Sequence, residues 1–167
     1  VGGNVSLPLS LRGVRDPGRV AEMLELFKIA ALKDRDANRL SQGERRRAAL
    51  ARAFVTRPKL LLLDEPFSSL DARVKASIVR DLRGIIRTAG AAAMLITQDL
   101  AEARALCDSM AVMMNGRIVQ RGAPREIFAR PVSRETADFV GAGAGGGGAP
   151  TNAGADLCSA ISEVKTI

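Results

Sequence analysis

Several residue types are absent or rare in this chain of 167 residues, and each absence excludes a class of protein. There is no histidine, tryptophan or tyrosine, and aromatic residues make up 3% of the sequence. This argues against nucleic-acid-binding modules that stack bases on exposed aromatic side chains. The two cysteines, Cys107 and Cys158, lack the spacing of a zinc site or a disulfide framework, which fits a reducing compartment. No apolar run approaches the roughly 18 residues of a membrane-spanning helix.

The residues that are present supply enough apolar surface for one folded domain and an excess of positive charge. Hydrophobic residues make up 47% of the chain, so we expect a core of Leu, Ile, Val, Met and Ala. The net charge of +7 suits an anionic partner, such as nucleotide phosphates, nucleic acid or an acidic membrane, but suits a solvated arginine-rich surface equally well. We interpret one arginine cluster as a solvated helix face rather than a nucleic-acid patch: Arg45, Arg46, Arg47 and Arg52.

Helical patterns dominate the first part of the chain. Residues 18–32 carry apolar side chains at helical spacing, whereas residues 5–11 alternate only weakly. A second helix is predicted to start at Ser41, because Ser41 and Glu44 form an S-x-x-E capping box. It should stop before Pro58, since proline disfavours the helical conformation of the residue that precedes it.

Strands and helices alternate in the following part, which predicts an α/β domain with a largely parallel sheet. The run KLLLLDEP predicts a fully buried strand over residues 59–63. The further expected elements are a helix capped by Asp71 and ended by Gly90, a strand over 92–96, a helix over 100–106, a hairpin over 109–122 around Asn115-Gly116, and helices over 124–129 and 133–140. After residue 140 the glycine-rich GAGAGGGGAP is typical of a flexible linker, and we expect a disordered tail with one helical turn near residues 157–164.

Two adjacent acids, Asp64 and Glu65, follow the predicted buried strand. Ligands of open α/β sheets bind at such carboxyl ends. A carboxylate at Asp64 can hold Mg²⁺, usually through water, and Glu65 can orient or deprotonate an attacking water molecule. The alternative is that the two acids only cap a strand end.

The predicted helix start at Ser41, Gln42, Gly43 and Glu44 is a candidate anion site. Free backbone amides and the positive end of the helix dipole favour an anion there, and Gly43 allows close approach of its backbone. An ordinary capping box is compatible with this role. Glu44 brings a carboxylate near the expected phosphate, and the repulsion is reduced if its side chain turns back onto the cap.

Two segments, RLSQGERRRAALARAF and LLLLDEPFSSLDARV, together resemble the ATP-binding-cassette (ABC) ATPases. The first is similar to the family's signature motif, and the second to its Walker B strand and D-loop. The resemblance extends from residue 4 to residue 141. Within the family, the segment GRIVQRGAPREIFARP resembles importers of small solutes such as metal ions, oxyanions, sugars or polyamines.

The resemblance implies a partial P-loop NTPase domain and an ATP-hydrolysing subunit with ATP and Mg²⁺ as cofactors. Asp64 would contact the metal, Glu65 would be the general base, and the segment 41–44 would cover a nucleotide held by a second ATPase subunit. Ser68, Ser69 and Asp71 would couple the two sites of that dimer. The partners would be integral-membrane permease subunits on the cytoplasmic face of the membrane, and we expect no nucleic acid. The implied domains are 1–57 (helical subdomain ending in the signature helix), 58–140 (ATPase core) and 141–167 (linker and tail).

Two features depart from the family pattern. No G-x-x-x-x-G-K-[ST] phosphate loop, or Walker A motif, occurs anywhere in the sequence, so we expect the chain to be the distal part of a longer protein. Gln98 stands where the family has a histidine that contacts the γ-phosphate, and glutamine cannot carry a positive charge. We therefore predict that this chain alone does not hydrolyse ATP. Two other interpretations remain open: a non-catalytic remnant that docks on an intact ATPase, and a DNA-directed ATPase of the same family.

Overall fold

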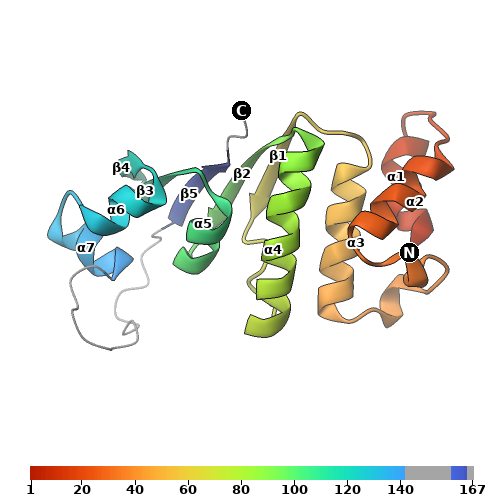
Figure 1. Cartoon of the computed structure of the whole chain (residues 1–167), viewed down its shortest axis with the longest axis horizontal. Coiled ribbons are helices and arrows are strands. Elements are labelled where there is room, and N and C mark those ends of the chain that lie inside the picture. Colours follow the sequence, from red (N-terminus) through yellow and green to blue (C-terminus); the bar gives the residue numbers. More distant parts are fainter. Residues whose placement is uncertain (142–158, 165–167) are drawn as a thin grey trace. The chain divides into compact units, whose positions relative to one another are not determined.

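The computed structural model describes residues 1–141 and the backbone of residues 159–164. In chain order the elements are the helices α1 (Gly2–Ser10) and α2 (Pro17–Leu26), the 3₁₀ turns η1 (Ala30–Leu32) and η2 (Ala37–Arg39), α3 (Gln42–Phe54), β1 (Leu60–Asp64), α4 (Ala72–Ala89), β2 (Ala92–Thr97), α5 (Leu100–Leu106), β3 (Ser109–Met114), β4 (Arg117–Gly122), α6 (Pro124–Ala129), α7 (Arg134–Val140) and β5 (Ser159–Val164) (Figure 1). The predicted α/β class is confirmed by this alternation.

The chain divides into two compact units, which are described separately. Unit 1 comprises residues 1–61 and 66–91, and unit 2 comprises residues 62–65 and those from 92 onward. α4 packs with α3 and is therefore grouped with the N-terminal helices. These compact units are not the functional segments 1–57, 58–140 and 141–167, which stay a prediction.

Unit 1 is a helical unit around an aliphatic and phenylalanine core. The rings of Phe27 and Phe54 pack with their centroids 5.6 Å apart, and both side chains are buried. The guanidinium of Arg19 donates to the carbonyl oxygens of Phe54 (2.9 Å) and Val55 (3.3 Å), and thereby satisfies the free end of α3. These contacts join α2 to the carboxyl end of the helix that begins at Ser41.

Two elements of unit 1 differ from their sequence patterns. The helix expected over residues 18–32 ends at Leu26, since Lys28 adopts a left-handed conformation with φ 58° that cannot continue a helix. The weakly alternating residues 5–11 lie largely in α1, where Val5 and Leu9, four residues apart, form the buried face.

The five strands form one sheet in the order β1-β2-β5-β3-β4 (Figure 1). β5 runs antiparallel to both β2 and β3, so β2 and β3 are parallel to each other. β3 and β4 form the predicted hairpin, with positive φ angles at Asn115 (49°) and Gly116 (73°). One buried cluster of unit 2 is formed by Ala103, Met110, Val112, Ile127 and Val140.

Two predictions about the sheet were wrong. The linker and tail were expected to be disordered, with a helical turn near residues 157–164. Residues 142–158 and 165–167 lie outside the described part of the chain, but residues 159–164 form β5 in the interior of the sheet. The strand at residues 59–63 was expected to be fully buried, but Leu60 and Leu62 of β1 are 56% and 67% exposed. Leu61 is buried, so the described residues cover one face of this strand and leave the other open.

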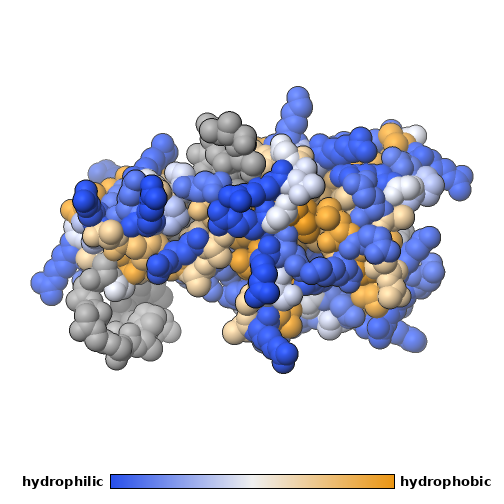
Figure 2. Space-filling view, viewed as in Figure 1, coloured by the Kyte–Doolittle hydropathy of each residue, from blue (hydrophilic) through white to orange (hydrophobic). Residues whose placement is uncertain are grey.

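Among the described residues, no helix is long and apolar enough to cross a membrane. Figure 2 shows that hydrophilic residues cover much of the visible face, with apolar areas between them. This distribution is in keeping with the charged content of the sequence.

Candidate functional site

Glu65 and Gln98 lie at the ends of the neighbouring strands β1 and β2. The backbone N–H of Glu65 donates to the carbonyl of Ile96 (2.9 Å), and the backbone N–H of Gln98 donates to Oε1 of Glu65 (3.0 Å). Glu65 also has a positive φ of 40°, a conformation that non-glycine residues adopt at a cost and that is often found at functional sites. The structure thus brings together the two residues that the sequence assigned to hydrolysis.

This contact uses the backbone amide of Gln98, not its side chain. Any residue other than proline at position 98 would supply the same donor, and the side chain of Gln98 is exposed. This hydrogen bond to the Glu65 carboxylate therefore does not depend on whether residue 98 is glutamine or histidine.

A buried polar pair that the sequence pattern did not reveal supports the turn after β2. The Oγ1 of Thr97 donates to Oε2 of Glu102 at 2.7 Å, and the two residues are 0% and 3% exposed. The same Oγ1 accepts from the N–H of Asp99 (3.0 Å), whose carboxylate in turn caps α5 by accepting from the N–H of Ala101 (2.8 Å). Gln98 is thus held between two residues with fixed side chains. In the sequence, this buried pair is indicated only weakly, by an acidic residue among the apolar residues of a short helix.

Asp64 is the last residue of β1 and is exposed. An exposed carboxylate is a hard oxygen donor that suits Mg²⁺ with water as the other ligands, so this residue fits as one metal ligand. No group of three or more candidate ligand side chains occurs among the described residues. Asp64 is therefore the candidate Mg²⁺ ligand that the described residues supply.

The predicted capping box at the start of α3 is confirmed. The N–H and the hydroxyl of Ser41 both donate to Oε2 of Glu44 (2.7 and 2.8 Å), and the N–H of Glu44 donates to the Ser41 hydroxyl oxygen (3.3 Å). The hydrogen bonds from the backbone and hydroxyl of Ser41, together with the charge of Arg35, lower the pKa of Glu44. The Glu44 carboxylate thus turns back onto the cap, as the sequence suggested.

Gly43 lies in the first turn of α3 against the first turn of α4. A β-carbon at this position would be 2.7 Å from Cγ1 of Val74, which is too close for a real contact. Asp71 caps α4 by accepting from the N–H of Val74 (2.9 Å), as predicted. The family resemblance assigned the start of α3 to nucleotide binding and the start of α4 to dimer coupling, and these two helix starts pack directly together in unit 1. Ser68 and Ser69, which precede α4 in the sequence, are exposed.

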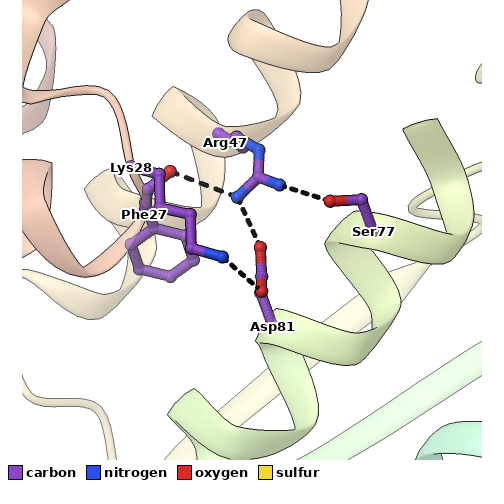
Figure 3. A network of polar contacts seen from close by, with 5 residues as sticks. All are labelled: Phe27, Lys28, Arg47, Ser77 and Asp81. Atoms are coloured by element: carbon purple, nitrogen blue, oxygen red, sulfur yellow. Dashed lines mark hydrogen bonds and ion pairs between the residues drawn. The ribbon is translucent and has the colours of Figure 1, made fainter.

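Further along the same two helices, an ion-pair network joins α3 and α4 (Figure 3). Arg47 of α3 donates to Asp81 (2.9 Å) and Ser77 (3.1 Å) of α4 and to the carbonyl of Phe27 (3.3 Å), and Lys28 donates to the other oxygen of Asp81 (2.8 Å). Partial burial, the largest single influence, raises the pKa of Asp81, but the hydrogen bonds and charges of Lys28 and Arg47 together outweigh it and the pKa lies below its ordinary value. Arg47 was interpreted as part of a solvated face, which is wrong for this residue because its side chain is 14% exposed.

Comparison with known proteins adds the following. The family model described as ABC transporter matches residues 4–68. An Fe(3+) ions import ATP-binding protein of Rhodococcus jostii is 43% identical over 142 residues, which cover 84% of this chain and 41% of that protein. A molybdate/tungstate import ATP-binding protein of Archaeoglobus fulgidus is 48% identical over 124 residues, which cover 74% of this chain and 51% of that protein.

Among solved structures, cbiO1 from Clostridium perfringens, described as part of an ABC transporter complex, is similar with a TM-score of 0.64 and 32% identity. The match covers 72% of this chain and 47% of that one. The chain thus spans about half the length of its relatives, or less.

Proposed function

We propose that this chain, which belongs to the ABC transporter ATP-binding family, supplies the general base and the signature segment of an ATPase that drives import of a small solute. The observation that carries the proposal is the Glu65 carboxylate, held by the Gln98 amide beside Asp64 at the carboxyl end of β1. A carboxylate so held accepts a proton from a water molecule and orients that water toward a phosphorus atom. The printed names of the relatives, which are import ATP-binding proteins, support the transport role.

Mg²⁺ would be held in part by Asp64, and when bound it would neutralise charge on the phosphate oxygens. The residues of this chain do the remaining work. Glu65 accepts the proton from water at one carboxylate oxygen while the Gln98 amide holds the other. Thr97 and Glu102 keep the turn that carries this amide in place.

The helix start at Ser41 would face the γ-phosphate of a nucleotide on a second ATPase subunit. Its support is chemical: the amides of Gln42 and Gly43 lie in the first turn of a 13-residue helix, where the dipole favours an anion. Glu44 is directed onto the cap and away from that role. The direct packing of Gly43 on Val74 would transmit a shift of this helix start to the segment Ser68–Asp71. The membrane partners would be permease subunits, which places the assembly at the cytoplasmic face of a membrane.

Gln98 should slow hydrolysis without abolishing nucleotide binding. A neutral amide replaces a group that would carry positive charge next to the transferred phosphoryl group. Loss of a transition-state contact worth about 3 kcal/mol slows turnover roughly a hundredfold. We therefore expect slow turnover that depends on Glu65.

A chimera tests the proposal. Residues 4–141 replace the matching segment of the Rhodococcus jostii relative, and ATP turnover and ATP binding are measured with matched Glu65→Gln and Gln98→His variants. Binding should be retained in all three proteins, turnover should disappear in Glu65→Gln, and Gln98→His should raise it at least tenfold. Turnover that is unaffected by Glu65→Gln would refute the assignment of the base.

A second candidate function is the docking role that the sequence analysis left open. The chain would then dock on an intact ATPase and donate its signature segment without hydrolysing ATP itself. Titration of the chain into an intact relative distinguishes the two, because a docking subunit changes the turnover of its partner. A Ser41→Ala variant is the matched control, and unchanged turnover with both proteins would dismiss this candidate.

A further inference from the structure

Ser41 has two hydrogen-bond donors at the start of α3, its backbone N–H and its hydroxyl, and one carboxylate oxygen accepts from both. Oε2 of Glu44 lies 2.7 Å from the Ser41 nitrogen and 2.8 Å from the Ser41 Oγ. A hydroxyl has a single hydrogen, so after donating it to Glu44 the oxygen can only accept, as it does from the N–H of Glu44 (3.3 Å). In this arrangement Ser41 has no donor left for a second anion.

The two backbone amides that follow Ser41 differ from it in this respect. Gln42 and Gly43 open α3, and the first N–H groups of a helix have no partner within that helix. Gln42 is exposed and Gly43 is half-buried. An anion at this helix start can therefore reach the amides of Gln42 and Gly43, but it can gain the donors of Ser41 only if the Glu44 carboxylate gives them up.

The Glu44 carboxylate is held at the cap by Ser41 and by no ion pair within the described residues. Arg35 acts on it only as a nearby charge, the smallest of the influences on its pKa. Arg45 directs its guanidinium elsewhere, with Nε donating to the carbonyl of Leu40 (2.9 Å) and Nη2 to that of Asn38 (3.2 Å). Since the hydrogen bonds between Ser41 and Glu44 are exposed, the carboxylate can turn away without uncovering the buried residues of α3.

We propose that the Glu44 carboxylate is an internal competitor for phosphate at the start of α3, and that it regulates the access of a nucleotide phosphate to Ser41. The inference rests on the proposed function, because it takes the phosphate of a nucleotide as the ligand of this helix start. In one state Glu44 holds both donors of Ser41, and in the other they bind phosphate. The apparent affinity for phosphate is reduced by the small fraction of molecules in the second state.

The test is a titration of the full ¹⁵N-labelled chain with inorganic phosphate, followed by NMR at constant ionic strength. Glu44→Gln removes the charge but keeps the capping box, since glutamine also serves at this position. We expect the dissociation constant, taken from the amide signals of residues 41–43, to fall at least about fivefold, because charge-assisted hydrogen bonds to Ser41 are replaced by weaker neutral ones. Glu25→Gln, which removes an exposed negative charge from α2, is the matched control and should change nothing. Equal constants for wild type and Glu44→Gln, or no response to phosphate in either, would overturn the proposal.

A second comparison separates competition from plain charge repulsion. In a Ser41→Ala background there is no hydroxyl to release, so Glu44→Gln should improve phosphate binding by only about twofold, through the backbone N–H and the lost charge. A gain of the same size in both backgrounds would refute the competition.

The phosphate titration involves neither Glu65 nor ATP turnover. If it fails while the chimera retains turnover that depends on Glu65, this inference alone is refuted. If Glu65 proves irrelevant to turnover, the assignment of the base falls and the result of the titration still stands.

Discussion

The Arg47–Asp81 pair offers a quantitative test of how α3 and α4 are joined. Asp81→Asn keeps the size of the side chain but removes the charge that receives hydrogen bonds from Arg47 at 2.9 Å and Lys28 at 2.8 Å. The Arg47 and Asp81 side chains are 14% and 17% exposed, so their charge-assisted bond is worth about 1.5–3 kcal/mol. The Lys28 side chain is 65% exposed and contributes below about 1 kcal/mol. Because the amide oxygen retains one acceptor, we expect a loss of about 2 kcal/mol, or roughly 30-fold in the folding equilibrium.

The assay is denaturant unfolding followed by far-ultraviolet circular dichroism, since the chain has no tryptophan or tyrosine for fluorescence. Asp138→Asn is the matched control, because Asp138 pairs with Arg134 at 4.0 Å and both side chains are largely exposed. Its cost should stay below about 0.5 kcal/mol.

The pH dependence provides a second criterion. The folded-state pKa of Asp81 is lowered, so its contribution is complete above the ordinary aspartate pKa of 3.8 and is lost as the pH falls through the folded value. The difference between the wild type and Asp81→Asn should therefore be full at pH 7 and shrink below pH 3.8. A cost below about 0.5 kcal/mol at pH 7, or a difference that does not depend on pH, would refute the reasoning.

Three further predictions concern the candidate site. Gly43→Ala places a β-carbon 2.7 Å from Val74 and should lower the free energy of unfolding by about 1–3 kcal/mol in the same assay. Adding Val74→Ala should recover most of this loss, and simply additive losses in the double variant would contradict the contact. Ser41→Ala should cost about 1 kcal/mol and raise the pKa of Glu44 toward 4.5, as followed by NMR titration, whereas an unchanged pKa would show that the cap does not set it. Gln98→His in the chimera should raise turnover at least tenfold while ATP affinity stays the same, and a failure to do so would remove Gln98 as the cause of slow hydrolysis.

The resemblance to the ABC transporter ATP-binding family was visible in two short segments, and the relatives confirm it. The capping box at Ser41 and the helix ends could equally be predicted from the sequence. Ser41 with Glu44, Asp71 with Val74, and Gly90 in the left-handed conformation all act within four residues of chain. Their geometry depends on local hydrogen bonds and steric limits, so the sequence pattern suffices to predict them.

Contacts between residues far apart in the sequence could not be predicted from local patterns. Gln98 reaches Glu65 across 33 positions, and Arg47 reaches Asp81 across 34. The family resemblance suggested the first pair would act together, but not that a backbone amide makes the contact. No local pattern distinguishes Arg47, which is mostly buried, from the arginines beside it, because burial depends on which helix packs against it.

The amino-acid sequence by itself determined the α/β class, the family resemblance and the positions of the helix caps, and it predicted which residues would carry the chemistry. Only the tertiary structure decided which strand fills the space between β2 and β3, which face of β1 is covered, and how Glu65 is held. The physical reason is the range of the interactions. A cap or a turn is stable through its own few residues, whereas a strand such as β5 gains its hydrogen bonds from partners far away in sequence, and a short, weakly patterned segment therefore shows its place in the sheet only when the whole fold is present.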